Sequence, residues 1–418
     1  YFVPSWYHGN EYKENEQYWY RRRTVTEFDD SVKQVQMFNR NNIMDYKILN
    51  LSYCPNFRHF LHRQSVFHAP YWSCFDAIQE IRRTKVDILS YRDLMWPDYT
   101  EFVYTPFCIV AYVHNEKYAE IHFGEDGNMI EVFLFQSEVM VRKNIYDDRG
   151  FLSTTIVYEN NQPVYEQYLD EKGNWKLLHF FEDDHIEINS ENPYYLIGNK
   201  RFTFQSLNYD SIESLIEEVF STYLDEMTDS TDIFCLAMHT LHHDLLESLF
   251  TQRKTILSFY QNRMDLFEDA ELKSLIRSTN YCIVDSKHKI RPLEKYAEKT
   301  LPIVDITPFD TRADFGISQQ LTVQNILVPI DSIEQSKLEA LIVLFAKYFE
   351  TNETARVHFF TRNANWDRVD SVLNFTREVL KANGLDERLA RKETNDKAEF
   401  DLDEDEKVPI KFFVDQCV

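Results

Sequence analysis

The chain has 418 residues, 44% of them hydrophobic, which is enough for two or three domains with cores of their own. Its 69 Asp and Glu outnumber its 45 Lys and Arg, and the formal net charge of -24 argues against sequence-independent binding to nucleic acid. The six cysteines are widely spaced without a Cys-x-x-Cys pair, which favours reduced thiols in a cytosol. We see no signal peptide and no apolar run that could cross a bilayer, so we expect a soluble protein.

The first hundred residues alternate strand-like and helical patterns, as βα units do. Residues 1–4 are typical of a short buried strand, and the acidic residues in 28–31 can cap the helix that follows. A second strand is predicted over residues 46–51, with helical patterns around 57–62 and 74–81. The chain begins without Met and stops soon after a strand-like run, which indicates that one or both ends are missing.

From residue 102 to residue 188 the periodicity of apolar residues drops to two and stays there. Short clusters of Gly, Asn and Asp separate the apolar runs, and these residues reach positive φ at low cost, which suits tight hairpins. The pattern predicts a meandering antiparallel sheet inserted into an α/β protein. Four of the eight glycines lie in this stretch, where they can serve turns: Gly124, Gly127, Gly150 and Gly173.

After the insertion the α/β pattern resumes. Asp210 and Glu213 form a candidate capping box for a long amphipathic helix over residues 212–224. Alternation of strands and helices then favours parallel βαβ crossovers. The predicted strands are residues 233–237, 255–259, 281–284 and 302–306.

A second α/β pattern starts at residue 325. Helices are predicted over residues 338–349 and 369–380, and the strands over residues 326–328, 357–360 and 408–413. Only three strands fit here. A doubly wound sheet commonly has five or six, so the second domain looks incomplete.

This order of elements is the plan of a GT-B glycosyltransferase. We therefore predict an α/β, GT-B-like protein with two Rossmann-like domains and an antiparallel β-meander inserted in the first. The first domain is expected over residues 1–101 and 205–318, the inserted sheet over 102–204, and the second domain over 319–418. The edge strands of the inserted sheet are where we expect a partner, and we expect the α/β core to fold without residues 102–188.

Six short motifs carry a narrower resemblance. They lie at residues 1–7 (YFVPSWY), 71–76 (YWSCFD), 96–98 (WPD), 104–107 (YTPF), 146–152 (YDDRGFL) and 168–175 (YLDEKGNW). Together they resemble the first, GT-B-like member of the accessory secretory protein family. That family works in the accessory Sec pathway, which exports glycosylated serine-rich-repeat adhesins from Gram-positive bacteria. The resemblance spans nearly the whole chain and thins after about residue 265.

The resemblance implies a protein without transferase activity and without a cofactor. It implies a complex with two companion accessory secretory proteins, recognition of the glycosylated serine-rich-repeat adhesin, and delivery of that adhesin to the accessory Sec motor. The implied location is the cytoplasm, with peripheral association at the inner face of the membrane left open.

Residues after the first strand of the second domain bear on catalysis. Transfer from a nucleotide donor requires cations or amides against the leaving diphosphate, and retaining GT-B enzymes commonly place there an Arg and, five residues on, a Lys. The matching positions are Ile330 and Gln335, which carry no charge. Lys337 and Arg362 could still face the cleft. An active transferase that modifies Ser or Thr of a protein therefore stays an alternative, and a scaffold with an empty cleft is a third.

The loop after the first strand is the candidate glycan site. Trp6 and Tyr7 offer stacking surface, while His8 and Asn10 offer hydrogen bonds to hydroxyl groups. In a GT-B arrangement this loop opens at the carboxyl end of the sheet, where acceptors lie. The alternative is that Trp6 and Tyr7 pack against the next helix.

Other chemistry finds little support in the sequence. His239, His242, His243 and Asp244 lie together, but no Cys or distant His at fixed spacing completes a tetrahedral metal set, so an ordinary polar loop end is favoured. No Walker-type loop, Gly-x-Gly-x-x-Gly or Gly-x-Ser-x-Gly is present. We therefore predict neither a metal site nor a nucleotide-binding loop.

Overall fold

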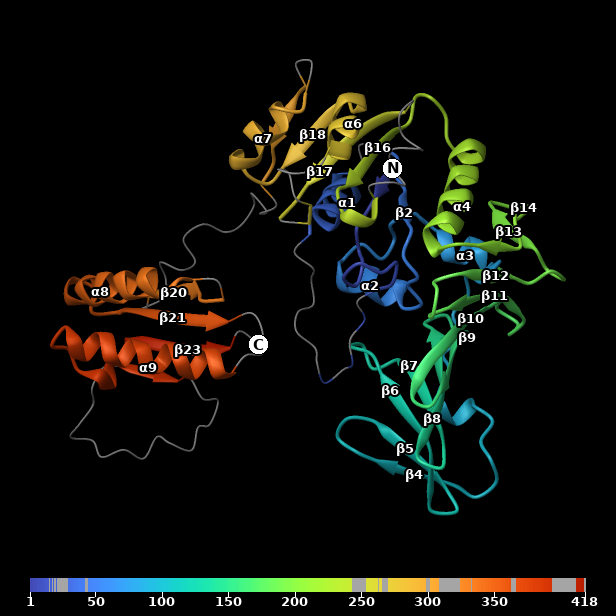
Figure 1. Ribbon diagram of the computed structural model, residues 1–418, viewed down its shortest axis with the longest axis horizontal. Coiled ribbons are helices and arrows are strands. Elements are labelled where there is room, and N and C mark those ends of the chain that lie inside the picture. The colour runs from blue at the N-terminus through green and yellow to red at the C-terminus, as the bar shows by residue number, and fades with distance from the viewer. Residues whose placement is uncertain are drawn as a thin grey trace. The chain divides into compact units, whose positions relative to one another are not determined.

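The computed structural model describes residues 1–14, 16, 18, 20, 29–41, 44–242, 253–261, 263–264, 270–297, 301–307, 324–331, 333–361, 366–392 and 411–416. Two compact units are present, Tyr1–Phe309 and Asp310–Val418, and each is described by itself (Figure 1).

A seven-stranded sheet, parallel throughout, forms the α/β part of the first unit. This confirms the parallel crossovers that the alternation of strands and helices predicted. The second strand is shorter than predicted, and β3 was not predicted at all. In sheet order the strands are β19 (Ile303–Asp305), β18 (Tyr281–Val284), β17 (Lys254–Phe259), β16 (Ile233–Ala237), β1 (Phe2–Val3), β2 (Ile48–Asn50) and β3 (Tyr71–Ser73).

The helices of this unit begin close to where their polar caps lie in the sequence. Asp29 caps the first helix, because its Oδ1 accepts a hydrogen bond from the Val32 amide at 3.1 Å. The predicted capping box of the long helix is wrong by one residue, since Ser211 accepts from the Ser214 amide. The helices are α1 (Asp30–Asn41), α2 (Phe57–Arg63), α3 (Cys74–Ile78), α4 (Ile212–Met227), α6 (Ala270–Ser278) and α7 (Ile290–Glu294), with 3-10 turns η2 (Tyr91–Asp93), η3 (Thr240–His242) and η4 (Lys287–Lys289).

Between α3 and α4 the chain forms a ten-stranded antiparallel sheet, which confirms the meander. Gly150 has φ of 91°, and a Cβ there would lie 1.7 Å from the Asp87 carbonyl oxygen, so this turn requires glycine. The strands are β4 (Thr100–Tyr104), β5 (Ile109–Val113), β6 (Glu116–Phe123), β7 (Met129–Gln136), β8 (Val139–Asp147), β9 (Phe151–Glu159), β10 (Gln162–Leu169), β11 (Trp175–Phe180), β12 (Ile186–Ile188) and β15 (Asn208–Tyr209), with a separate hairpin of β13 (Tyr194–Ile197) and β14 (Lys200–Thr203).

The near end of the antiparallel sheet shares the core of the α/β part. Tyr168, Leu177, Ile186 and Ile188 belong to one apolar cluster with residues of α4 and of the parallel strands. The far end has a cluster of its own around Ile109, Ile121 and Val132. Removing residues 102–188 would therefore strip side chains from the main core, contrary to the expectation that this core folds without them.

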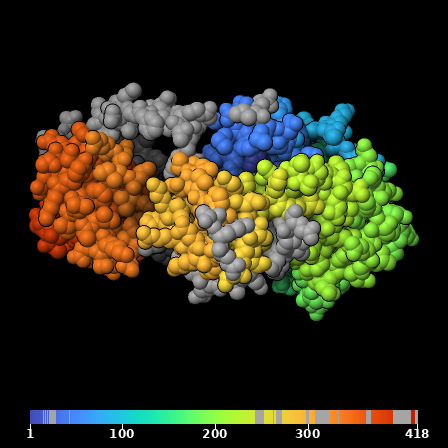
Figure 2. Space-filling view, turned by 90° about the horizontal axis from the view of Figure 1, so that it is seen from above, coloured from blue at the N-terminus to red at the C-terminus, as the bar shows by residue number. Residues whose placement is uncertain are grey.

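Segments that are distant in sequence meet in this unit. The Tyr1 ammonium donates a hydrogen bond to the Ile233 carbonyl at 2.8 Å, and Trp72 stacks on Tyr223 of α4 with 4.2 Å between ring centroids. Figure 2 shows early parts of the chain, in blue, beside later parts of the first unit, in green and yellow. The short strand β1 is thus held in the middle of the sheet by later parts of the chain.

The second unit contains a parallel four-stranded sheet rather than the predicted three strands. Its last strand begins at Phe412, later than predicted, and residues 408–410 lie outside the described residues. A separate apolar core includes Ile342, Phe359 and Phe412. The elements are β20 (Gln324–Pro329), α8 (Gln335–Thr351), β21 (Ala355–Thr361), α9 (Trp366–Ala382), η6 (Glu387–Leu389), β22 (Ala390–Lys392) and β23 (Phe412–Gln416).

Candidate functional site

The carboxyl edge of the seven-stranded sheet gathers polar side chains from four elements. Because all strands of this sheet run parallel, the segments after β1, β16 and β17 emerge at the same edge, where the start of α1 also lies. Ligands of open α/β sheets bind at such edges. We therefore take this edge as the candidate functional site.

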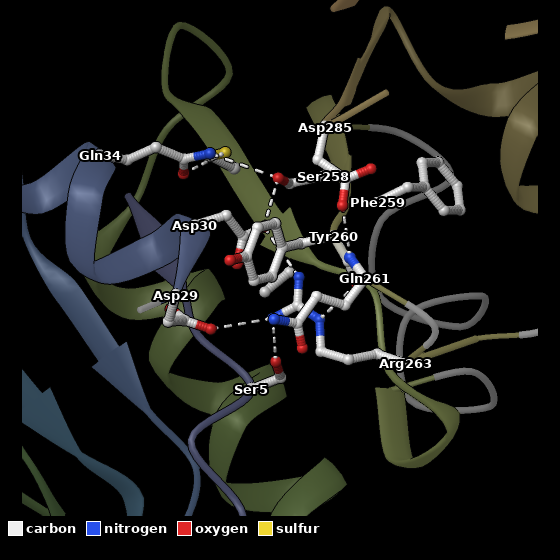
Figure 3. A network of polar contacts seen from close by, with 12 residues as sticks. Ser5, Asp29, Asp30, Gln34, Ser258, Phe259, Tyr260, Gln261, Arg263 and Asp285 are labelled. Carbon is white, nitrogen blue, oxygen red and sulfur yellow. Dashed lines mark hydrogen bonds and ion pairs between the residues drawn. The ribbon is translucent and has the colours of Figure 1, made fainter. Parts of the chain in front are cut away.

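Arg263, which follows β17, is the centre of the polar network in Figure 3. Its Nη1 donates to Ser5 Oγ at 2.6 Å and to Asp29 Oδ2 at 3.2 Å, and its Nη2 donates to Asp30 Oδ2 at 2.8 Å. Ser258 Oγ donates a further hydrogen bond to Asp30 Oδ2 at 2.5 Å. The guanidinium is thus bound by groups of this chain.

Two carboxylates occupy the beginning of α1, where the helix dipole and free amides favour negative charge. Burial raises the pKa of Asp29 to about 6, the neighbouring Asp30 carboxylate adds to the rise, and Arg263 opposes it. An external anion such as a phosphate would meet these carboxylates first. The chemistry of this edge therefore suits uncharged groups better than anions.

Trp6 packs within the first unit. Its ring lies 4.8 Å from that of Phe60 and 6.1 Å from that of Phe57, both on α2, and its Nε1 donates to Asp29 Oδ1 at 3.1 Å. The side chain remains half-buried. Trp6 thus packs against α2 and is also partly exposed at the carboxyl edge of the sheet.

Tyr7 forms a hydrogen-bonded pair with His242. The Tyr7 hydroxyl lies 2.6 Å from His242 Nε2, and His242 Nδ1 lies 2.7 Å from the Ala237 carbonyl oxygen. Burial lowers the pKa of His242 to about 3, so the ring is neutral, donates from Nδ1 and accepts from Tyr7. The Tyr7 hydroxyl is therefore engaged inside the protein.

His8 and Asn10 are exposed, unlike the two aromatic residues before them. The His8 amide donates to the Lys13 carbonyl at 2.7 Å, and Asn10 Oδ1 accepts from Thr240 Oγ1 at 3.2 Å. The structure thus brings the candidate residues Trp6, Tyr7, His8 and Asn10 to one edge but in different roles, with two engaged internally and two at the surface.

In the second unit, the position after β20 where retaining GT-B enzymes commonly carry an Arg is occupied by an uncharged residue. Ile330 is fully buried, and its amide donates to the Phe360 carbonyl at 2.9 Å. Gln335 is the first residue of α8, and Lys337 is exposed with its Nζ 3.3 Å from Glu334. Arg362 lies outside the described residues.

A guanidinium does reach this loop from α9. Arg368 Nη2 donates to the carbonyl oxygens of Ile330 and Ile333, each at 3.1 Å. Those hydrogen bonds hold the loop in place and direct that nitrogen toward the main chain.

No group of three or more metal-ligating side chains gathers anywhere in the described parts of the chain. His239 and His242 both contact the Tyr7 ring, at 5.3 Å between centroids. His243 and Asp244 fall outside the described residues.

Nothing in the spacing of the sequence indicates Arg263 as the central residue of the edge. Its partners Ser5, Asp29 and Asp30 are 258, 234 and 233 residues away. The acidic pair Asp29 and Asp30 predicts a helix cap. Two adjacent acids also need a nearby cation once they are buried, but their position in the sequence does not say which residue supplies it.

Comparison with known proteins identifies the family. The family model for an accessory Sec system protein, accessory secretory protein 1, matches residues 1–418. The chain belongs to this family. A member from Streptococcus gordonii is 30% identical over 423 residues, covering 99% of this chain and 78% of its own length.

Solved structures extend the likeness to the fold. A complex of accessory secretory proteins 1, 2 and 3 from Streptococcus pneumoniae contains a chain with a TM-score of 0.75 and 26% identity, covering 91% of this chain and 76% of that one. The pneumococcal O-GlcNAc transferase GtfA, solved with UDP and GlcNAc, matches with a TM-score of 0.60 at 10% identity, covering 90% and 74%. This second likeness shows a glycosyltransferase-like fold alone. Within the described helices, none is both long and apolar enough to span a membrane.

Proposed function

We propose that the protein is a non-catalytic, glycosyltransferase-like subunit of an accessory Sec export complex. It binds a glycosylated serine-rich-repeat adhesin and promotes its delivery to the accessory Sec motor, and it works with two companion accessory secretory proteins. Family membership supports the pathway, and the pneumococcal complex of accessory secretory proteins 1, 2 and 3 supports the companions.

The observation that carries the non-catalytic part is the buried Ile330. In a nucleotide-sugar transferase the leaving diphosphate needs cations close by. Here the residue after β20 has no exposed surface, and Lys337 is paired with Glu334 at the surface. The Arg368 nitrogen Nη2 that reaches the loop donates to main-chain carbonyls. These contacts favour a loop without a diphosphate site.

The test compares catalysis with binding on the same adhesin segment. With UDP-activated N-acetylglucosamine and the unmodified segment, we expect neither sugar transfer nor donor hydrolysis, while the glycosylated segment should bind more tightly than the unmodified one. Lys337→Ala should change neither result. Steady product formation that disappears in Lys337→Ala would favour the alternative, an active transferase that modifies Ser or Thr of a protein.

The companion proteins are proposed to bind at β4. This strand ends the ten-stranded sheet and exposes Val103, Tyr104 and, just beyond it, Phe107, which are 48%, 61% and 57% exposed. An edge strand with apolar side chains can pair with a strand of another chain.

Point variants test this surface better than a deletion, because part of the sheet belongs to the main core. Val103→Asp should abolish formation of the three-protein complex in size-exclusion chromatography. Val139→Asp is the matched control, since Val139 is a 39% exposed valine on β8 of the same sheet. Complex formation that survives Val103→Asp would place the companions elsewhere.

A further inference from the structure

A cavity of about 440 Å³ lies where α2, β3, the segment after α3 and the turn between β8 and β9 meet. This volume is within the range of small-molecule sites. Two of the six sequence motifs contribute to the lining, residues 71–76 and 146–152, and the proposed function uses neither. The charged residues of the lining are four arginines and one aspartate, namely Arg58, Arg82, Arg83, Arg149 and Asp76.

The one carboxylate of the lining is neutralised by an arginine. Arg149 donates from Nη1 to Asp76 Oδ2 at 2.8 Å and from Nη2 to Asp76 Oδ1 at 2.7 Å. Asp147 and Asp148 do not line the cavity, and they accept from Arg149 Nε at 2.7 Å and from the His59 amide at 3.1 Å. The other three arginines therefore make the lining positive, in a chain whose formal net charge is -24.

These three guanidinium groups keep donors that the protein does not use. Arg82 is exposed, and it has no hydrogen bond or ion pair with the residues that the structure describes. Arg58 lies over the Phe67 ring, with its Cζ 5.5 Å from the ring centroid, which leaves its N–H groups free. Arg83 donates one hydrogen bond, from Nη1 to the Gly150 carbonyl at 3.2 Å.

The Tyr71 hydroxyl adds a neutral donor. Burial, with a smaller contribution from the Asp76 carboxylate, raises the pKa of Tyr71 to about 12, so the hydroxyl is protonated at neutral pH. The charges of Asp76 and Arg149, which both line the cavity, act on this hydroxyl and place it on the cavity side. The ring is held by an edge contact with Phe57, at 4.9 Å between centroids.

This set of donors fits a phosphate better than a carboxylate. A guanidinium binds oxyanions through parallel N–H groups, and one such group satisfies the single charge and two oxygens of a carboxylate. Three guanidinium groups and a hydroxyl match the double charge and three terminal oxygens of a phosphate monoester. Phe67, which is 42% exposed, and Leu61 supply apolar surface for the group that carries the phosphate.

We propose that this cavity binds a water-soluble phosphate monoester with a small apolar or aromatic substituent. Arg58, Arg82 and Arg83 hold the phosphate oxygens, the Tyr71 hydroxyl donates to one of them, and Phe67 packs against the substituent. The site goes beyond the proposed function and does not rest on it.

The experiment is calorimetric titration of the full chain in a chloride buffer at about pH 8, above the second pKa of about 6 of a phosphate monoester. Phenyl phosphate should bind with a dissociation constant below about 1 mM. Inorganic phosphate should bind at least about threefold more weakly, because it lacks the ring that contacts Phe67. Benzoate, which keeps the ring but carries a carboxylate, should bind at least about tenfold more weakly.

Three variants locate the binding. Arg82→Gln removes no contact within the described part of the chain, so the fold should stay intact while the dissociation constant of phenyl phosphate rises about tenfold. Arg142→Gln is the matched control, because Arg142 is an exposed arginine on β8 outside the lining, and it should change the constant less than about twofold. Tyr71→Phe keeps the ring and should raise the constant about threefold. Melting temperatures show that the variants fold.

Each other outcome overturns the proposal. Equal binding by Arg82→Gln and the unchanged protein, benzoate binding as tight as that of phenyl phosphate, or no binding of either phosphate would refute a phosphate site here. Vesicles of phosphatidylglycerol form the last arm. Binding to vesicles that Arg82→Gln weakens, without binding of a soluble phosphate, would assign these arginines to a membrane surface instead. The adhesin assay is separate, so the proposed function stands or fails independently.

Discussion

Acid should destabilise the first unit through His242. This ring is completely buried, and burial, with smaller contributions from His239 and Arg263, lowers its pKa from an ordinary 6.5 to about 3. Between these two values the unfolded chain binds a proton that the folded chain does not. Stability must therefore fall as the pH drops below about 6.5.

The size of the effect follows from the pKa difference. Each pH unit below 6.5 costs about 1.4 kcal/mol, so His242 should remove about 2 kcal/mol of the unfolding free energy by pH 5. We propose urea unfolding followed by circular dichroism at neutral pH and at pH 5, on the unchanged protein and on His242→Gln. The unchanged protein should lose about 2 kcal/mol more than the variant over that interval.

The difference between the unchanged protein and His242→Gln isolates the contribution of His242 to the pH dependence. Asp29 titrates with a pKa of about 6 and acts in the opposite sense, since a carboxyl with a raised pKa favours the folded state as the pH falls, but it is present in both proteins. Tyr7→Phe is a further control. It should cost about 1 kcal/mol for one hydrogen bond while keeping the acid sensitivity. Equal pH dependence of His242→Gln and the unchanged protein would refute a neutral, buried His242.

Two further substitutions test the packing around the site. Trp6→Ala should lower the unfolding free energy by about 3 kcal/mol, because it removes the ring from Phe60 and a donor from Asp29. An unchanged urea midpoint together with weaker binding of the glycosylated adhesin segment would instead assign Trp6 to glycan binding. Lys176→Met should cost about 3 kcal/mol, because the fully buried Nζ donates to Glu80 at 2.8 Å and to two carbonyls. Calorimetry checks this against Lys200→Met, an exposed lysine, where the loss should stay below about 1 kcal/mol.

The order of helices and strands could be predicted from the sequence, because the spacing of apolar residues and the composition of the turns are local properties of the chain. Residues 102–188 alternate with a period of two, and the structure has an antiparallel sheet there. Two short strands were not predicted from the pattern of apolar residues. Tyr71–Ser73 runs directly into α3, and Ala390–Lys392 carries two basic residues among three. Each pairs with one neighbouring strand in parallel, and that pairing is decided by tertiary contacts rather than by propensity.

The candidate site was predictable in its place but not in its contacts. Trp6 and Tyr7 could be placed at the carboxyl edge because they follow a strand of a parallel sheet. Their partners could not, since Tyr7 meets His242 across 235 positions and Trp6 meets Asp29 across 23. Sequence spacing carries no information about pairs joined only by the packing of separate elements.

The distribution of buried charge supports the proposed function, in which the protein recognises a glycan and does not transfer a sugar. A nucleotide sugar has two parts, a diphosphate that needs positive charge and a ring that needs hydroxyl partners and an apolar face. At α1 the chain places Asp29 and Asp30, and after β20 it buries Ile330, so both loops disfavour a diphosphate. Binding a glycan already attached to a protein requires only that second part.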